Sequence, residues 1–127
     1  MPPTSPPVVL ELPADPRLLR LARVTVASAA AELPFTLQDI EDLRVAVDEL
    51  AAVLIDGCDP SATLRIEVVI TTGSVEVRGR VAGAGALLAL HPVAVDLLQL
   101  VAPGHQLANE GDDRVFRLVR EAQIAVP

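Results

Sequence analysis

Glu49 is the side chain best placed to do chemistry. It lies in the run from Phe35 to Gly57, FTLQDIEDLRVAVDELAAVLIDG, at a spacing of seven from both Asp42 and Asp56. Seven residues are close to two helical turns, so the three carboxylates share one face of a helix. A carboxylate in a pocket can act as a general base, whereas on a solvated face it contributes only charge. Both interpretations stay open for Glu49.

The charged residues exclude several other kinds of site. All ten cationic residues are arginines, so no chemistry that needs a lysine is available: no phosphate-loop lysine, Schiff base or Ser-Lys dyad. The net charge of -7 argues against nucleic acid, whose binding depends on neutralising phosphates. A basic surface on a partner protein fits this charge better. His91, His105 and Cys58 have unrelated spacings and match no metal site.

Nothing in the chain predicts a membrane or secretory protein. Cys58 is the single cysteine, which rules out an intrachain disulfide and is compatible with a reducing compartment. The N-terminal MPPTSPP lacks the basic and apolar regions of a leader, and the apolar run Gly83–Leu90 is too short to cross a bilayer. We expect a cytoplasmic protein.

Three helices are predicted to position these residues. Asp15-Pro16 is a helix start, and the first helix is expected over 16–33, with Pro34 after it. The second covers 35–57, with Thr36 as N-cap and Gly57 at its end. A third begins at His91 or Pro92.

Five strands are predicted around these helices, from alternating β-branched residues at 8–12, 63–71, 74–81, 105–109 and 114–120. The order predicts a two-layer α+β sandwich, in which about three helices cover one face of a mostly antiparallel sheet. We expect one domain over 8–120, a flexible proline-rich arm at 1–7 and a loose tail at 121–127.

Three segments resemble the bacterial anti-sigma-factor serine kinases, which have the histidine-kinase-like (GHKL) ATPase fold. The segment LARVTVASAAAEL at 21–33 is similar to the first helix of that family. DIEDLRVAVDELAAVLI at 39–55 looks like its E-x-x-x-N helix, with Glu49 at the position of the acidic residue. VAGAG at 81–85 looks like a degenerate form of the D-x-G-x-G nucleotide-binding motif. The resemblance implies the fold, a homodimer and a nucleotide site at Gly83 and Gly85.

The chain departs from the family at the residues that hold Mg-ATP. The family's magnesium-binding Asn falls at Val53, which has no oxygen to offer, and the one asparagine, Asn109, is expected near the closing turn. The Asp that contacts adenine falls at Val81. Only residues 86–90 separate VAGAG from the third helix, which leaves no room for the family's lid over the phosphates. We therefore expect no bound cofactor.

The resemblance implies a partner-binding surface on the first helix. Arg23 aligns with an arginine that contacts the sigma factor and the anti-anti-sigma protein in the family, and Arg20 lies one turn before it. A surface ion pair is the simpler role for both. The function expected is an anti-sigma-like protein that sequesters its partner. The alternative is an active ATP-dependent serine kinase, with Glu49 as base and an atypical magnesium site made by water or Asp48.

Overall fold

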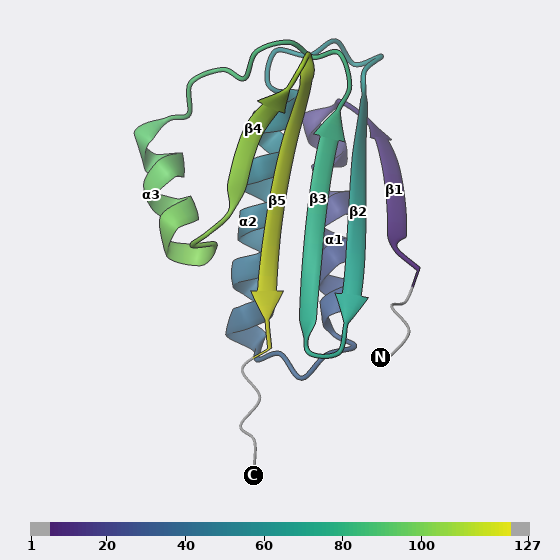
Figure 1. The fold of residues 1–127 in the computed structure, drawn as a ribbon, viewed down its shortest axis with the longest axis vertical. Helices are drawn as coiled ribbons and strands as arrows, with labels where there is room; N and C mark the ends of the chain where they lie inside the picture. The colour runs from purple at the N-terminus through teal and green to yellow at the C-terminus, as the bar shows by residue number, and fades with distance from the viewer. Residues whose placement is uncertain (1–5, 123–127) are drawn as a thin grey trace.

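The computed structural model describes residues 6–122, which form one antiparallel sheet and three α-helices (Figure 1). The strand order in the sheet is β1-β2-β3-β5-β4. The strands are β1 Val8–Pro13, β2 Thr63–Thr71, β3 Ser74–Val81, β4 Gln106–Glu110 and β5 Asp113–Glu121. The helices are α1 Leu19–Ala30, α2 Leu37–Ile55 and α3 Pro92–Val101, with a 3₁₀ turn η1 at Pro16–Leu18. The predicted α+β class is confirmed.

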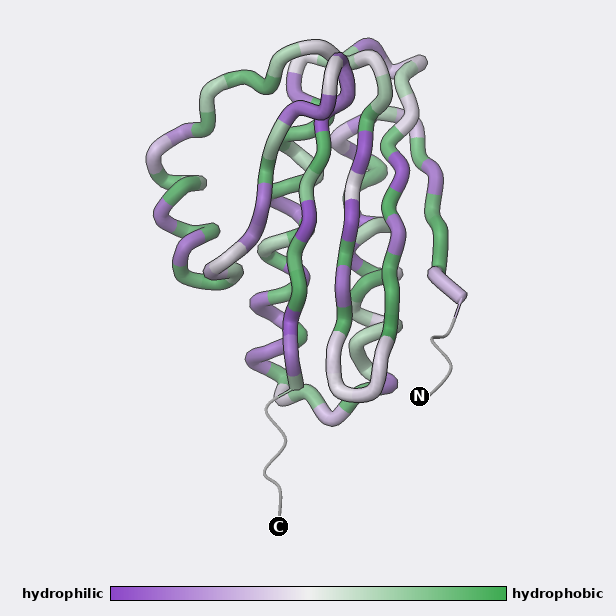
Figure 2. The backbone as a smooth tube through the Cα atoms, viewed as in Figure 1, coloured by the Kyte–Doolittle hydropathy of each residue, from purple (hydrophilic) through white to green (hydrophobic). Residues whose placement is uncertain are grey.

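The core lies between the sheet and the two longer helices. Helices α1 and α2 run side by side behind the sheet (Figure 1). Buried residues alternate with more exposed ones in β2, β3 and β5, and the hydropathy of these strands is banded in the same way (Figure 2). The fully buried side chains are nearly all aliphatic, and Phe116 of β5 is the one aromatic residue buried among them.

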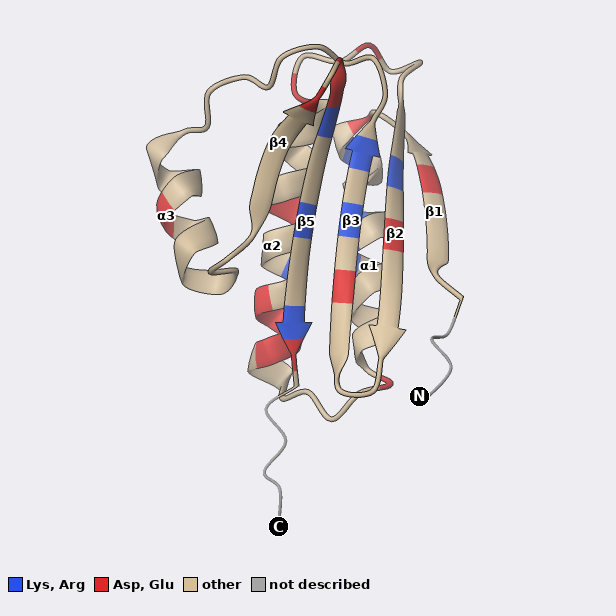
Figure 3. Ribbon diagram, in the orientation of Figure 1, with Lys and Arg blue, Asp and Glu red and all other residues tan. Residues whose placement is uncertain are grey.

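The opposite face of the sheet is covered by charges instead of helices. Arginine and acidic residues alternate with other residues along β2, β3 and β5 (Figure 3). Several pair across strands: Arg65 of β2 contacts Glu11 of β1, and Arg80 of β3 contacts Glu110 and Asp113. Arg65 also contacts Glu67 within its own strand. Because this face is charged, it favours contact with water over contact with a further layer of helices.

The first helix is shorter than predicted. Residues 16–18 form the separate turn η1, with Asp15 as its N-cap. Helix α1 ends at Ala30, where the backbone N–H groups of Glu32 and Leu33 bond to carbonyls three residues back. Such bonds tighten the last turn and close the helix, and Pro34 then disfavours helical geometry at Leu33.

The third helix lies at the edge of the sheet. His91 caps α3 by accepting a hydrogen bond at Nδ1 from the Val93 N–H at 3.1 Å. The helix lies beyond β4 and packs on α2, so α1 and α2 make up the layer behind the sheet (Figure 1). Leu98 and Val101 are its buried residues.

The predicted arm and tail lie largely outside the described residues, which include only Pro6 and Pro7 of the arm. Of the tail, Glu121 belongs to β5 and is paired with Ser74. Strand β5 therefore extends one residue further than predicted at each end. No helix within 6–122 is long and apolar enough to cross a membrane.

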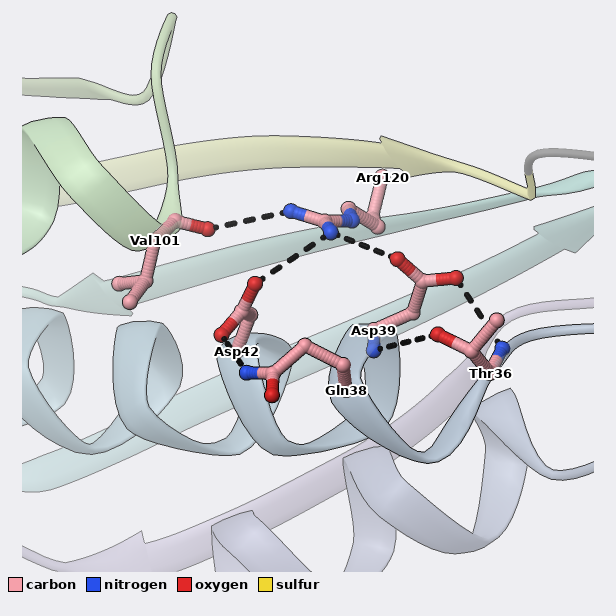
Figure 4. Close-up of polar contacts among 6 residues, drawn as sticks. All are labelled: Thr36, Gln38, Asp39, Asp42, Val101 and Arg120. Atoms are coloured by element: carbon pink, nitrogen blue, oxygen red, sulfur yellow. Dashed lines mark hydrogen bonds and ion pairs between the residues drawn. The ribbon is translucent and has the colours of Figure 1, made fainter.

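The N-terminus of α2 is held by a cluster of polar contacts (Figure 4). Thr36 and Asp39 form a capping box, in which each side chain accepts a hydrogen bond from the other's backbone N–H. Arg120 of β5 donates to Asp39 Oδ1 at 2.7 Å, to Asp42 Oδ2 at 3.4 Å and to the Val101 carbonyl at 3.3 Å. One guanidinium thus joins β5, α2 and α3.

We predict that Asp39 stabilises the protein in a pH-dependent way. Arg120 first, and then the Thr36 N–H, hold the pKa of the Asp39 carboxyl below its usual value. The unfolded-state pKa is about 3.9, so the contribution is present above about pH 4 and is lost as the pH falls through the lower folded-state pKa. Asp39→Asn removes this contribution.

Urea unfolding of the wild type and Asp39→Asn at pH 7, 5 and 3 measures the effect. The difference in free energy of unfolding should be the same at pH 7 and 5 and smaller at pH 3. Glu41→Gln, an exposed substitution on the same helix with the same charge change, should cost much less at pH 7. A difference that stays constant down to pH 3 would contradict the assignment.

Candidate functional site

Glu49 and Val53 line one cleft, as their spacing of one helical turn predicted. The cleft has a volume of about 550 Å³ and lies between the C-terminal half of α2, the residues around η1 and the segment 88–94 that leads into α3. Glu49 is half-buried. Its carboxylate has no hydrogen bond or ion pair within residues 6–122, so it is free to meet a ligand.

The residues of this cleft do not fit a magnesium-bound phosphate chain. Val53 supplies no oxygen, and the ionised side chains of the lining are the carboxylates Asp15, Glu49 and Asp56, with no arginine. Within the described part of the chain, no three His, Cys, Asp or Glu side chains gather as a metal site. Asp48, the possible replacement ligand, is outside the lining and pairs with Arg23 at 3.5 Å. Phosphates would meet like charge here.

Gly83 and Gly85 lie outside this lining, in a loop that is tied to the β4–β5 hairpin. Both have positive φ, +66° and +78°, which a residue with a side chain rarely adopts. Gly83 N–H donates to Asp113 Oδ1 at 2.9 Å, and Gly85 N–H donates to the Asp112 carbonyl at 2.9 Å. The two N–H groups that a nucleotide could use are already bonded.

Asn109 holds the same loop from the other side. Its Nδ2 donates to the Gly85 carbonyl at 2.8 Å, and its Oδ1 accepts from the Leu87 N–H at 3.0 Å. The one asparagine of the chain therefore fixes a loop. Val81, at the position of the family's adenine-binding Asp, is fully buried in the core.

Arg114 is a structural residue that the sequence analysis missed. It is 4% exposed and extends from the inner face of β5 toward the end of α2. Nη1 donates to the Leu54 carbonyl at 3.1 Å and to the Asp56 carbonyl at 2.7 Å, while Nε donates to the Gly85 carbonyl at 3.3 Å. A cation at a helix C-terminus also meets the negative end of the helix dipole. Arg114 thus joins the C-terminal end of α2 to the loop that contains Gly83 and Gly85.

Arg20 and Arg23 lie on α1 and do not line the cleft. Arg23 is about one-third exposed, and its Nε lies 3.5 Å from Asp48 Oδ1, which joins α1 to α2. Arg20 is exposed. The two predicted partner-binding residues therefore lie outside the lining that contains Glu49.

A solved structure shares this fold. Neither protein-family models nor curated protein sequences match the chain. The crystal structure of the RsbU and RsbW domains of Rv1364c from Mycobacterium tuberculosis matches with a TM-score of 0.66 and 15% sequence identity, over 96% of this chain. The chain spans 35% of the length of that protein chain. The fold expected from the sequence resemblance is confirmed by this match.

We predict that Arg114 is needed for stability far more than its exposed neighbours. Arg114→Ala removes the donor of the Asp56 carbonyl and the arginine bonds to the Leu54 and Gly85 carbonyls, which should lower the free energy of unfolding by about 2–3 kcal/mol. Arg117→Ala, on the exposed face of the same strand, should cost less than about 1 kcal/mol. Urea unfolding measures both, and equal losses would contradict the role of Arg114.

Proposed function

We propose that this protein is a regulatory binding protein of the anti-sigma type, which sequesters a sigma factor or binds an anti-anti-sigma protein without transferring phosphate. The observation that carries the proposal is Val53 in the wall of the cleft, at the position of a metal-binding asparagine, within a fold that resembles the RsbU and RsbW domains of Rv1364c. The fold is kept while the ligands for Mg-ATP are replaced. Such a protein acts in the cytoplasm by occluding its partner.

Helix α1 is the proposed partner surface. Arg20 and Arg23 project from it beside two exposed apolar residues, Leu21 and Val24, which are 38% and 60% exposed. An arginine fork binds carboxylates bidentately and is weakly hydrated, so it suits an acidic partner surface. The exposed apolar side chains add area that association would bury.

Strand β1 and helix α1 also form the proposed homodimer face, within residues 8–33. Within residues 6–122, β1 is an edge strand that pairs only with β2, and its other edge can accept a strand from a second copy. Val8 and Val9 are both more than 40% exposed on it. A dimer built there would place both copies of α1 near the same partner.

A serine kinase is the second candidate, and the free carboxylate of Glu49 in the cleft is what favours it. A thermal shift assay with Mg-ATP and Mg-ADP separates the two. A ligand that binds only the folded state raises the melting temperature in a saturable way. We expect no such rise for this protein, and a saturable rise would refute the binding-only proposal.

The binding proposal is tested by affinity capture from the native cell lysate, with the bound proteins identified by mass spectrometry. Wild-type protein should recover a sigma factor or an anti-anti-sigma protein. Arg20→Ala with Arg23→Ala should weaken binding to that purified partner by about tenfold or more, because arginines are frequent interface hot spots.

Arg44→Ala is the matched control, since Arg44 is a partly exposed arginine on α2 that pairs with Glu41. It should change the affinity less than about twofold. Recovery of neither class of partner would overturn the proposed function. Equal weakening by Arg44→Ala would remove α1 as its binding surface.

A further inference from the structure

The cleft beside α2 is an apolar groove with an acidic rim. Its walls are largely apolar, with Ala52 and Val53 from α2 facing Leu88, Leu90 and Ala94 across the opening. Leu88 is 47% exposed, which is high for a leucine that lines a cavity. At about 550 Å³ the groove is large enough to take several side chains of a ligand.

Two acidic side chains of the lining have no partner in the described part of the chain: Glu49 of α2 and Asp56, the residue that follows the helix. Of the other carboxylates on this helix, Asp39 and Asp42 contact Arg120, Glu41 contacts Arg44 and Asp48 contacts Arg23. Within residues 6–122, the carboxylates of Glu49 and Asp56 have neither an ion pair nor a hydrogen bond. Both line the groove.

A third carboxylate of the lining is already neutralised. Asp15 accepts hydrogen bonds from the Arg17 guanidinium, the shortest of them at 2.8 Å. The unsatisfied charge of the groove therefore comes from Glu49 and Asp56. Seven residues apart, they lie about 10 Å from each other along the helix axis.

We propose that this groove binds a basic amphipathic segment of a partner protein. Apolar side chains of the segment fill the space between Val53 and Leu88, and two of its arginines or lysines pair with Glu49 and Asp56. An anionic ligand would be repelled, and a purely apolar ligand would leave the two carboxylates unused. This inference rests on the proposed function as a binding protein and assigns Glu49 to partner recognition.

Charge complementarity gives the partner a specific pattern. A helical segment with two cations seven residues apart repeats the spacing of Glu49 and Asp56 and presents apolar residues between them. Helices of this kind commonly bind in apolar grooves through such spaced anchors. Arg20 and Arg23 lie outside the groove lining but next to it, in the chain or through Asp48, so a partner in the groove could also contact them.

The test uses a defined probe and the whole chain. The probe is a fluorescein-labelled helix-forming peptide of about 15 residues, with leucines on one face and two arginines seven residues apart. A second peptide carries glutamates in place of the arginines. Fluorescence anisotropy should show saturable binding of the first peptide and none of the second.

Variants then locate the binding site. Glu49→Gln with Asp56→Asn should weaken binding about fivefold, as expected for the loss of two exposed ion pairs. The matched double variant Glu32→Gln with Glu41→Gln removes the same charge from exposed positions outside the groove lining and should change affinity less than about twofold. Unchanged melting temperatures confirm that both variants fold.

Amide NMR of the wild type with the arginine peptide gives the position directly. Shift changes should concentrate at Ala52, Val53, Leu88 and Ala94. No binding, equal weakening by the two double variants, or shifts spread outside the groove would each overturn the inference.

The purified partner distinguishes this inference from the proposed function. In one outcome, the captured sigma factor or anti-anti-sigma protein binds the wild type and the Glu49→Gln, Asp56→Asn double variant with equal affinity. In that case the groove inference fails and the proposed function stands. If the peptide binds in the groove but capture recovers neither a sigma factor nor an anti-anti-sigma protein, the proposed function fails and the groove serves another basic partner.

Discussion

Two arginines on one strand hold the two ends of the central helix, and the rest of the structure depends on this arrangement. Arg120 reaches Asp39 in the first turn of α2, and Arg114 reaches the last carbonyls of the same helix. Helix ends leave backbone groups unsatisfied, and a buried end without partners is costly. Between the arginines, Phe116 and Leu118 pack into the core. The inner face of β5 therefore places an arginine at each end of α2 and apolar side chains in the core between them.

The same strand and its hairpin also fix the loop of Gly83 and Gly85, where the sequence resemblance placed a nucleotide site. Arg114 and Asn109 use the carbonyl of Gly85, while Asp112 and Asp113 use the N–H groups of the glycine loop. These bonds make the loop part of the scaffold. The cleft beside α2 has largely apolar walls, and its carboxylates Glu49 and Asp56 have no partner within residues 6–122.

Much of the fold could be predicted from the sequence because its local patterns are clear. Strands β2 and β3 have the predicted bounds, since both are rich in β-branched residues that alternate over most of their length, and Thr72-Gly73 permits a tight turn. Glu49 and Val53 share a cleft because one helical turn separates them. Arg114 and Arg120 were missed for a physical reason. In RVFRLVR both faces carry arginine and apolar residues, so alternation alone does not decide which arginines turn inward, and only the facing helix does.

The contacts that hold α2 also constrain the order of folding. Arg114 lies 60 residues from Leu54 in the sequence, and Arg120 lies 81 residues from Asp39. Strand β5 follows β4 along the chain, yet it inserts between β3 and β4 in the sheet. Helix α2 is thus synthesised early, but its ends gain their arginine partners only after β5 has paired. Contacts of such long sequence separation slow folding, so completion of the sheet and locking of the helix become a single late step.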